Sequence, residues 1–262
     1  MMKVLVALLL LSTLSFPLGV NALAMPQAQV QKRALFLSSL NATRPMGYYA
    51  GSLVSSLNHA GYNVTYLADG AVTLSLLLTR MKNYSVVVWR TDSFTQKNAT
   101  YWYVGEKPSD AAEQRYASDF AAGRITTSTG MVAVSTDFFT NHFGPNALQD
   151  VKLLIFVSSN GNQLAPIFLA AGVTSVVFSS GAITLQFGLV DDLTAQLVGF
   201  LTQGETVYNA VYDTISPFNQ GENLKDPLDS TFGIIFWYLG DGTATIAPTI
   251  HSVPSTRLPR LP

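Results

Sequence analysis

The chain has 262 residues, 48% of them hydrophobic and 12% charged, and 15 Lys and Arg residues nearly balance 16 Asp and Glu residues for a net charge of −1. This balance gives no long-range attraction to nucleic acid or to an anionic membrane, so neither is an expected partner. The chain contains no cysteine, which excludes disulfides, thiolate zinc sites and a cysteine nucleophile.

Residues 1–24 have the pattern of a secretory signal peptide. Lys3 precedes a short apolar block, and Ala22-Leu23-Ala24 supplies the small residues of a cleavage site. A retained membrane anchor is the alternative, but the block is short for a span of about 20 residues and Pro17 interrupts it. We therefore expect a secreted or cell-surface protein without a stable membrane span after cleavage, in which residues 25–33 form a mobile leader.

The next part of the chain is predicted to alternate strands with helices. The expected elements are strand Ala34–Ser38, helix Tyr48–His59, strand Asn63–Leu67, helix Thr73–Met81 and strand Ser85–Arg90. Pro45 suits the first turn of the first helix, and Gly61 suits the position just past its end. Strands that alternate with helices form a parallel sheet with right-handed crossovers.

The middle of the chain is less regular. Tyr101–Val104 is predicted as a strand in an excursion hairpin, and Asp110–Glu113 as a capping box that opens a helix ending near Gly123. Met131–Val134 is predicted as a further short strand. Asp137–Phe143 is interpreted as a loop or a helical turn.

The segment from Lys152 to Asp213 has the clearest signal for a sheet. Leu153–Val157 and Val173–Phe178 are continuous apolar runs, which is typical of strands covered on both faces. The later predictions are helix Gln163–Ala171, a helix capped by Asp191 or Asp192 and closed by Gly204, helix Thr206–Thr214, a polar loop over Ser216–Thr231, strand Phe232–Leu239, and a tight turn at Gly240–Gly242 leading to Thr243–Ile246.

Taken together, these elements predict an α/β fold: a three-layer sandwich in which a mostly parallel sheet is flanked by helices. Residues 34–247 are predicted to form a single domain. Residues 248–262 are rich in proline and poor in apolar residues, so they are predicted to form a disordered tail.

Several segments in order also carry a family resemblance. They are Leu67–Leu74 with Tyr84–Trp89, Leu153–Ser159, Phe168–Val177, Leu201–Gly204 with Tyr208–Ala210, and Leu239–Asp241. Across Ala34–Ile246 this set resembles the caspase–gingipain type fold, which includes clostripain-like proteases and CHAT domains. The resemblance implies a caspase-like sandwich with a histidine after the third strand and a cysteine after the strand that begins at Leu153.

Both catalytic positions of that family differ in this chain. Arg90-Thr91-Asp92 stands where the resemblance implies His-Gly, and Ser158 or Ser159 stands at the cysteine position. Without a thiolate and a proton-moving histidine, we expect no cysteine peptidase activity. The resemblance thus implies a pseudoenzyme.

Ser158 or Ser159 could be a serine nucleophile, because both follow a predicted strand. A nucleophile elbow needs a small residue two positions before the serine and another two positions after it. Around Ser159 these positions hold Val157 and Gly161, so the pattern is half met. Asp92 could orient a base, but no histidine is near it in sequence. The three histidines, His59, His142 and His251, are scattered, and structural or surface roles are the simpler interpretation for each.

Other candidates have simpler structural explanations. Asp191 and Asp192 could bind a cation but are better explained as helix caps, and Gly240-Asp241-Gly242 is better explained as a turn than as a calcium loop. Tyr101-Trp102-Tyr103 could contact carbohydrate or protein, but packing is favoured. The sequence has no nucleotide-binding or zinc motif, so no cofactor is expected.

Four sequons are candidate glycosylation sites: Asn41, Asn63, Asn83 and Asn98. The leading hypothesis is a secreted, non-enzymatic binding or interaction protein whose protein or glycan partner is unknown. The alternatives are a divergent serine-type hydrolase that uses Ser158 or Ser159, and a glycosylated cell-surface structural protein. A hydrolase requires a base within hydrogen-bond reach of the serine.

Overall fold

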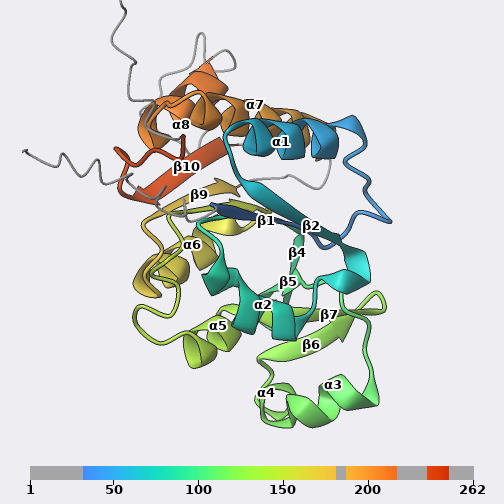
Figure 1. Ribbon diagram of the computed structural model, residues 1–262. Coiled ribbons are helices and arrows are strands. Elements are labelled where there is room, and N and C mark those ends of the chain that lie inside the picture. Colours follow the sequence, from blue (N-terminus) through green and yellow to red (C-terminus); the bar gives the residue numbers. More distant parts are fainter. Residues whose placement is uncertain (1–31, 181–186, 217–234, 248–262) are drawn as a thin grey trace, which may run out of the picture. The chain divides into compact units, whose positions relative to one another are not determined.

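The computed structural model describes residues 32–180, 187–216 and 235–247. Their main sheet has six strands in the order β10-β9-β8-β3-β1-β2, of which all but β10 run parallel (Figure 1). The strands are β1 Arg33–Ser38, β2 Asn63–Ala68, β3 Val86–Arg90, β8 Leu153–Val157, β9 Ser175–Ser180 and β10 Ile235–Gly240.

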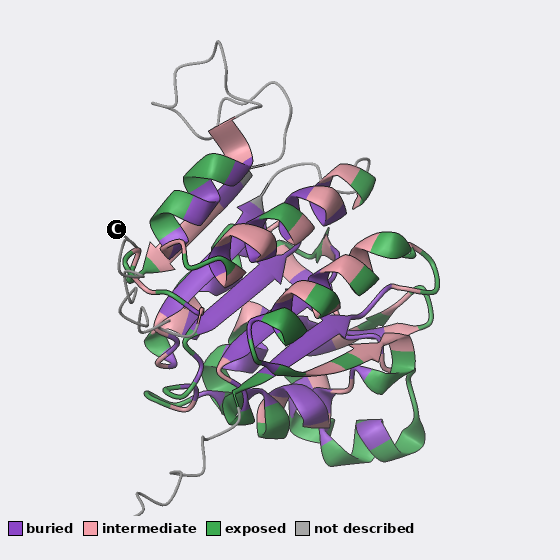
Figure 2. Ribbon diagram, turned by 45° about the horizontal axis from the view of Figure 1, so that its top comes forward, coloured by how far each residue is buried: buried purple, intermediate pink, exposed green. Residues whose placement is uncertain are grey.

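Helices cover both faces of this sheet, as the sequence predicts for a three-layer α/β sandwich (Figure 1). Alternate residues of each strand enter opposite layers: Val86 and Val88 of β3 pack with one set of helices, and Val87 and Trp89 with the other. One layer contains α1 Tyr48–His59, α7 Phe187–Thr202 and α8 Val207–Ile215; the other contains α2 Leu74–Arg80, α5 Thr136–His142 and α6 Gly161–Ala170. Every residue of β3 and β8 is buried, which explains their unbroken apolar runs (Figure 2).

A second, antiparallel sheet is inserted between β3 and β8, in the order β4-β5-β7-β6. Its strands are β4 Ser93–Gln96, β5 Ala99–Tyr103, β6 Ile125–Ser128 and β7 Met131–Ser135, and between β5 and β6 lie α3 Asp110–Arg115 and α4 Ala117–Ala121. Trp102 and Val134 from this sheet join the core beneath the main sheet. The predicted strand at Tyr101–Val104 is therefore confirmed as one arm of the β4–β5 hairpin, whereas β6 was not predicted.

Several predicted helix ends differ from the structure. Helix α1 is capped at Gly47, so Pro45 precedes the helix instead of lying in its first turn. In α3 the cap is Ser109, whose hydroxyl accepts the amide of Ala112, and Asp110 is the first helical residue. A serine oxygen reaches the amide three residues on as an N-cap, which explains the shift of one position.

One further prediction is wrong and two hold. Asp191 and Asp192 are not caps, because α7 begins at Phe187 and includes both. The predicted turn at Gly240–Gly242 is present: the carboxylate of Asp241 accepts the backbone amide and the hydroxyl of Thr243, which closes an Asx turn. Gly61 does follow the end of α1, with a φ of 84° that suits glycine.

Two short 3-10 turns flank α2: η1 Asp69–Ala71 and η2 Met81–Asn83. Among the described residues, no helix combines the length and the apolar character that a membrane crossing requires. Several predictions fall wholly or partly outside the described residues: the signal peptide, most of the mobile leader, the polar loop over Ser216–Thr231 from residue 217 onward, the start of the strand at Phe232, and the disordered tail.

Candidate functional site

The two strand ends singled out by the sequence lie side by side. Strands β3 and β8 are parallel neighbours, with Arg90 opposite Val157, so the residues that follow them meet at the carboxyl edge of the sheet. There the hydroxyl of Ser159 donates to Oδ1 of Asp92 at 2.9 Å. The structure thus brings together one residue from each of the two predicted positions.

Asp92 is the centre of a closed set of hydrogen bonds, which we call the Asp92 network: Arg44, Asp92, Ser93, Ser159 and Asn160. Oδ1 of Asp92 also accepts the amide of Ser93 at 2.8 Å, and Oδ2 accepts the guanidinium of Arg44 at 2.7 Å. The hydroxyls of Ser93 and Ser159 are 2.7 Å apart, and the side-chain amide of Asn160 donates to Ser93 at 2.8 Å. Both carboxylate oxygens of Asp92 are therefore occupied.

The turn from β8 into α6 places Ser159 and Asn160 in this network. Gly161 follows them as the first residue of α6, and a Cβ atom there would lie 2.4 Å from the backbone oxygen of Ser179. Only glycine allows that approach of the turn to β9. Gly161 fits one of the two small positions of the nucleophile elbow, and this close packing against β9 explains why the residue is glycine.

Ser158 is separate from the network. Its residue is fully buried, its amide donates to the hydroxyl of Ser179 at 2.9 Å, and its carbonyl accepts from that hydroxyl at 3.1 Å. The Ser158 hydroxyl itself has no partner among the described residues. The residue ties the end of β8 to β9 through its backbone, and nothing in the described part of the chain is placed to take its proton.

Arg90 has a structural partner that the sequence did not reveal. Its guanidinium binds Asp191 of α7 through two hydrogen bonds, 2.6 Å from Nε to Oδ1 and 2.9 Å from Nη2 to Oδ2, and both side chains are almost fully buried. Burial raises the pKa of the Asp191 carboxyl, and the guanidinium of Arg90 opposes this shift. The sequence signal was available: a buried arginine at a strand end needs an acidic partner, and Asp191 lies in a largely apolar helix.

Phe187 lies between these two arginine–aspartate pairs. The guanidinium carbons of Arg44 and of Arg90 are each 4.6 Å from the centre of its ring. An aromatic face attracts a cation at this distance, so Phe187 connects the exposed side of the Asp92 network to the buried pair. The sequence alone did not single out Phe187 or Arg44.

Thr91 is the remaining residue of the predicted histidine position, and its role is structural. Its amide donates to the carbonyl of Val157 at 2.9 Å, and its hydroxyl donates to the carbonyl of Tyr103 at 2.6 Å. It thereby joins the main sheet to the inserted sheet. Of the three residues Arg90-Thr91-Asp92, only Asp92 has a side chain in contact with Ser159.

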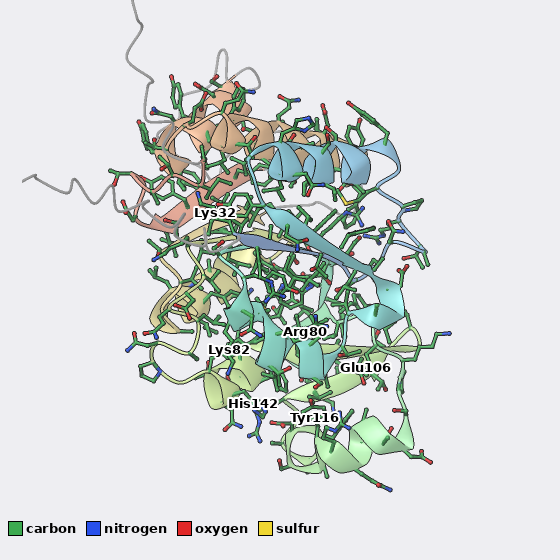
Figure 3. All side chains as sticks on the ribbon, in the orientation of Figure 1. Lys32, Arg80, Lys82, Glu106, Tyr116 and His142 are labelled. Atoms are coloured by element: carbon green, nitrogen blue, oxygen red, sulfur yellow. The ribbon has the colours of Figure 1, made fainter. Side chains whose placement is uncertain are left out.

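The two described histidines lie elsewhere. His59 contacts the carbonyl of Ser55 at 2.7 Å on the surface of α1. His142, labelled in Figure 3, is paired with Asp119 at 2.9 Å, and Arg124 binds the other oxygen of that carboxylate at 2.6 Å. Burial would raise the pKa of Asp119, but the hydrogen bonds and charges of Arg124 and His142 outweigh it and lower that pKa. His251 lies outside the described residues.

The aromatic cluster in β5 packs inward, as the sequence favoured. Trp102 is fully buried, and Tyr101 is nearly so, with its hydroxyl donating to the carbonyl of Gly123 at 2.8 Å. Phe94 of β4 lies 5.0 Å from the ring of Tyr103. These contacts hold the β4–β5 hairpin together, and the hairpin begins at Ser93 of the Asp92 network.

Comparison with known proteins gives no further constraint: no protein-family model matches the sequence, and no curated protein is significantly similar to it. The chemistry at the carboxyl edge of the sheet is therefore inferred from the side chains of the Asp92 network. It offers a hydroxyl–carboxylate contact in which the carboxylate is already neutralised by a guanidinium. Such an arrangement can hold a loop or present polar groups, and no free base lies beside it among the described residues.

Proposed function

We propose that this chain is a secreted, non-enzymatic binding domain of caspase-like architecture in which polar side chains fill the place of a catalytic dyad. The observation that carries the proposal is the Asp92 network. Ser159 donates to Asp92, and Asp92 is paired with Arg44 at 2.7 Å. Asp92 follows β3 and Ser159 follows β8, the two strand ends at which the family resemblance implies a histidine and a cysteine. The two residues are hydrogen-bonded to each other, but they do not form a nucleophile–base pair.

The absence of activity in this proposal follows from proton transfer. A serine attacks only when a neighbouring group removes its proton, and histidine is the usual base because its pKa of about 6.5 lies near neutral pH. Aspartate, with a pKa of about 3.9, is a weak base. At Asp92 both oxygens already accept hydrogen bonds, one of them from a guanidinium, so neither is free to take the serine proton.

The exposed side of the same edge is the proposed binding surface. Arg44 is about a third exposed at 32%, and Tyr48, four residues further along at the start of α1, is 77% exposed. Tyr49 and Phe187 are half-buried beside them. In open α/β sheets, ligands bind beyond the carboxyl ends of the strands, where this mixture of aromatic and polar groups lies. We propose a protein or glycan partner, since the near-neutral charge disfavours nucleic acid.

The test is labelling of the purified secreted chain with a fluorophosphonate, which reacts with activated serines. We expect no labelling above that of the matched Ser158→Ala and Ser159→Ala variants. Labelling that is lost in either variant would refute the non-enzymatic proposal. Titration of Arg44→Ala and Tyr48→Ala against glycan arrays and secreted-protein libraries tests the binding surface. The control is Tyr208→Ala: Tyr208 is 54% exposed, and its amide donates to the carbonyl of Gly242, just past the end of β10 at the opposite edge of the sheet.

The second candidate is a serine-type hydrolase, and one observation favours it: the 2.9 Å contact from the Ser159 hydroxyl to Asp92. In that case labelling must disappear in both Ser159→Ala and Asp92→Asn, and must persist in Ser158→Ala. Labelling that depends on Ser159 but not on Asp92 would mean that the base lies outside the described residues. No observation favours the cell-surface structural role over these two.

A further inference from the structure

The sequons of this chain are unevenly distributed. The chain has thirteen asparagines, and four of the five between residues 41 and 98 belong to Asn-x-Ser/Thr sequons. None of the other eight does. The sequons therefore fall between the end of β1 and the turn of the β4–β5 hairpin, and they are absent from the segments that form β8, β9, α7 and α8.

Asn98 lies in the turn of the β4–β5 hairpin. Gln96 pairs with Ala99 across the hairpin, so Lys97 and Asn98 form a two-residue turn, with φ of 49° and 64°. This geometry is typical of a type I′ turn, which tolerates asparagine. Asn98 is exposed, as are Gln96 and Lys97, and its amide bonds to no other described side chain or backbone group.

Asn63 and Asn83 are also exposed, and both lie at the amino edge of the main sheet. Asn63 is the first residue of β2, opposite Arg33 in the register, and β2 is an edge strand without a neighbour on its far side. Asn83 ends η2, two residues before Ser85, whose amide donates to the carbonyl of Arg33 at 3.0 Å. The edge position of β2 leaves the side chain of Asn63 in solvent.

Asn41 differs from these three. It is half-buried, its side-chain oxygen accepts the amide of Met46 at 3.4 Å, and the next amide, of Ala42, donates to Asp69 at 2.7 Å. The loop that follows β1 is thus folded back onto the domain. Because Asn41 is half-buried in this folded loop, a bulky group on its Nδ2 has less room than at the three exposed positions.

We infer that Asn63, Asn83 and Asn98 are acceptors of N-linked glycans and that Asn41 is not. The donor is a lipid-pyrophosphate-linked oligosaccharide, and a host oligosaccharyltransferase catalyses the transfer. A bond forms between the asparagine Nδ2 and C1 of the first sugar, the bond from C1 to the pyrophosphate oxygen breaks, the lipid pyrophosphate leaves, and the amide loses one proton. The inference rests on the proposed secretion but not on the proposed binding role.

The placement of these sites has a consequence for the candidate surface. Asn63 and Asn83 lie at the amino edge, whereas the Asp92 network lies at the carboxyl edge of the same sheet. Glycans at the amino edge would therefore leave the Asp92 network uncovered. The Asn98 glycan would stand on the hairpin that begins at Ser93 of that network.

The experiment is expression of the full chain, with its own residues 1–24, in secreting animal cells. The secreted protein is treated with peptide-N-glycosidase in ¹⁸O-water, which converts each glycosylated asparagine to ¹⁸O-labelled aspartate, and peptides are read by mass spectrometry. We expect label at the three exposed asparagines and none at Asn41. Label at Asn41, or none at Asn98, would overturn the assignment, and a secreted protein without any label would overturn it entirely.

A pair of variants isolates Asn98 without altering its turn. Thr100→Ala destroys the sequon and keeps Asn98 at its positive φ, so one glycan should be lost as a single step in gel mobility. Thr100→Ser keeps the sequon and should migrate as the parent does. Equal mobility of parent and Thr100→Ala would refute the assignment of Asn98. The fluorophosphonate result does not depend on glycosylation, so the two proposals can fail separately.

Discussion

Arg90 and Asp92 are two residues apart at the end of one strand, yet their ion pairs have different surroundings. The Arg90–Asp191 pair is almost fully buried and joins β3 to α7 by two hydrogen bonds. The Arg44–Asp92 pair has one exposed partner and shares its carboxylate with hydroxyl and amide donors. The contrast shows that position along the strand end, more than residue type, separates a pair buried within the fold from a pair with one partner at the surface.

The largest expected effect is on the buried pair. Removing one partner leaves an uncompensated buried charge, so Arg90→Ala or Asp191→Ala should each lower the free energy of unfolding by about 3–5 kcal/mol. The double variant Arg90→Met/Asp191→Leu, which removes both charges and keeps apolar volume, should be distinctly more stable than either single variant. Urea unfolding measures all three, and a double variant as unstable as the singles would contradict this account.

The Asp92 network should matter less for stability. Asp92→Ala removes hydrogen bonds from Arg44, Ser93 and Ser159, and the expected loss is about 1–3 kcal/mol because Arg44 remains hydrated. Within it, the coupling between Arg44 and Asp92 in a double-mutant cycle should be about 1 kcal/mol or less. A loss as large as that of Arg90→Ala would remove the distinction between the two pairs.

A third ion pair, Arg124–Asp119, can be compared with these two through the pH dependence of the free energy of unfolding. The pKa of Asp119 is lowered in the folded state, so the carboxylate stabilises the fold above its unfolded pKa of about 3.9. This contribution should be lost as pH falls below that value through the folded pKa. Asp119→Asn should therefore unfold with a weaker acid dependence than the parent between about pH 4 and pH 2 in urea titrations. An unchanged slope would show that the pair is not formed in solution.

The smallest effect is expected at Ser158. Its hydroxyl has no partner among the described residues, so Ser158→Ala should change the free energy of unfolding by no more than about 0.5 kcal/mol. Ser179→Ala, which removes two hydrogen bonds to the Ser158 backbone, should cost about 1 kcal/mol or more. If Ser158→Ala were the more damaging change, its hydroxyl would have a partner outside the described residues.

Much of the main sheet could be predicted because its signal is local. Continuous apolar runs at β3 and β8 follow from burial on both faces, and the helical spacing of Leu53 and Leu57 gives α1 with the observed bounds. Strand β6 could not be predicted, because its sequence Ile125-Thr-Thr-Ser128 has one apolar residue and pairs only through β7. Asp191 was misassigned as a cap because its partner lies 101 residues away.

The sequence by itself determined the order of the elements, the adjacency of the two strand ends and the absence of a cysteine–histidine dyad from them. Tertiary structure decided which polar groups pair there. Arg44 reaches Asp92 across 48 residues, and Ser159 reaches it across 67. The apolar pattern of each segment indicates its secondary structure and its buried face. A hydrogen bond between distant segments depends instead on sheet register and helix packing, which exist only once the chain has folded.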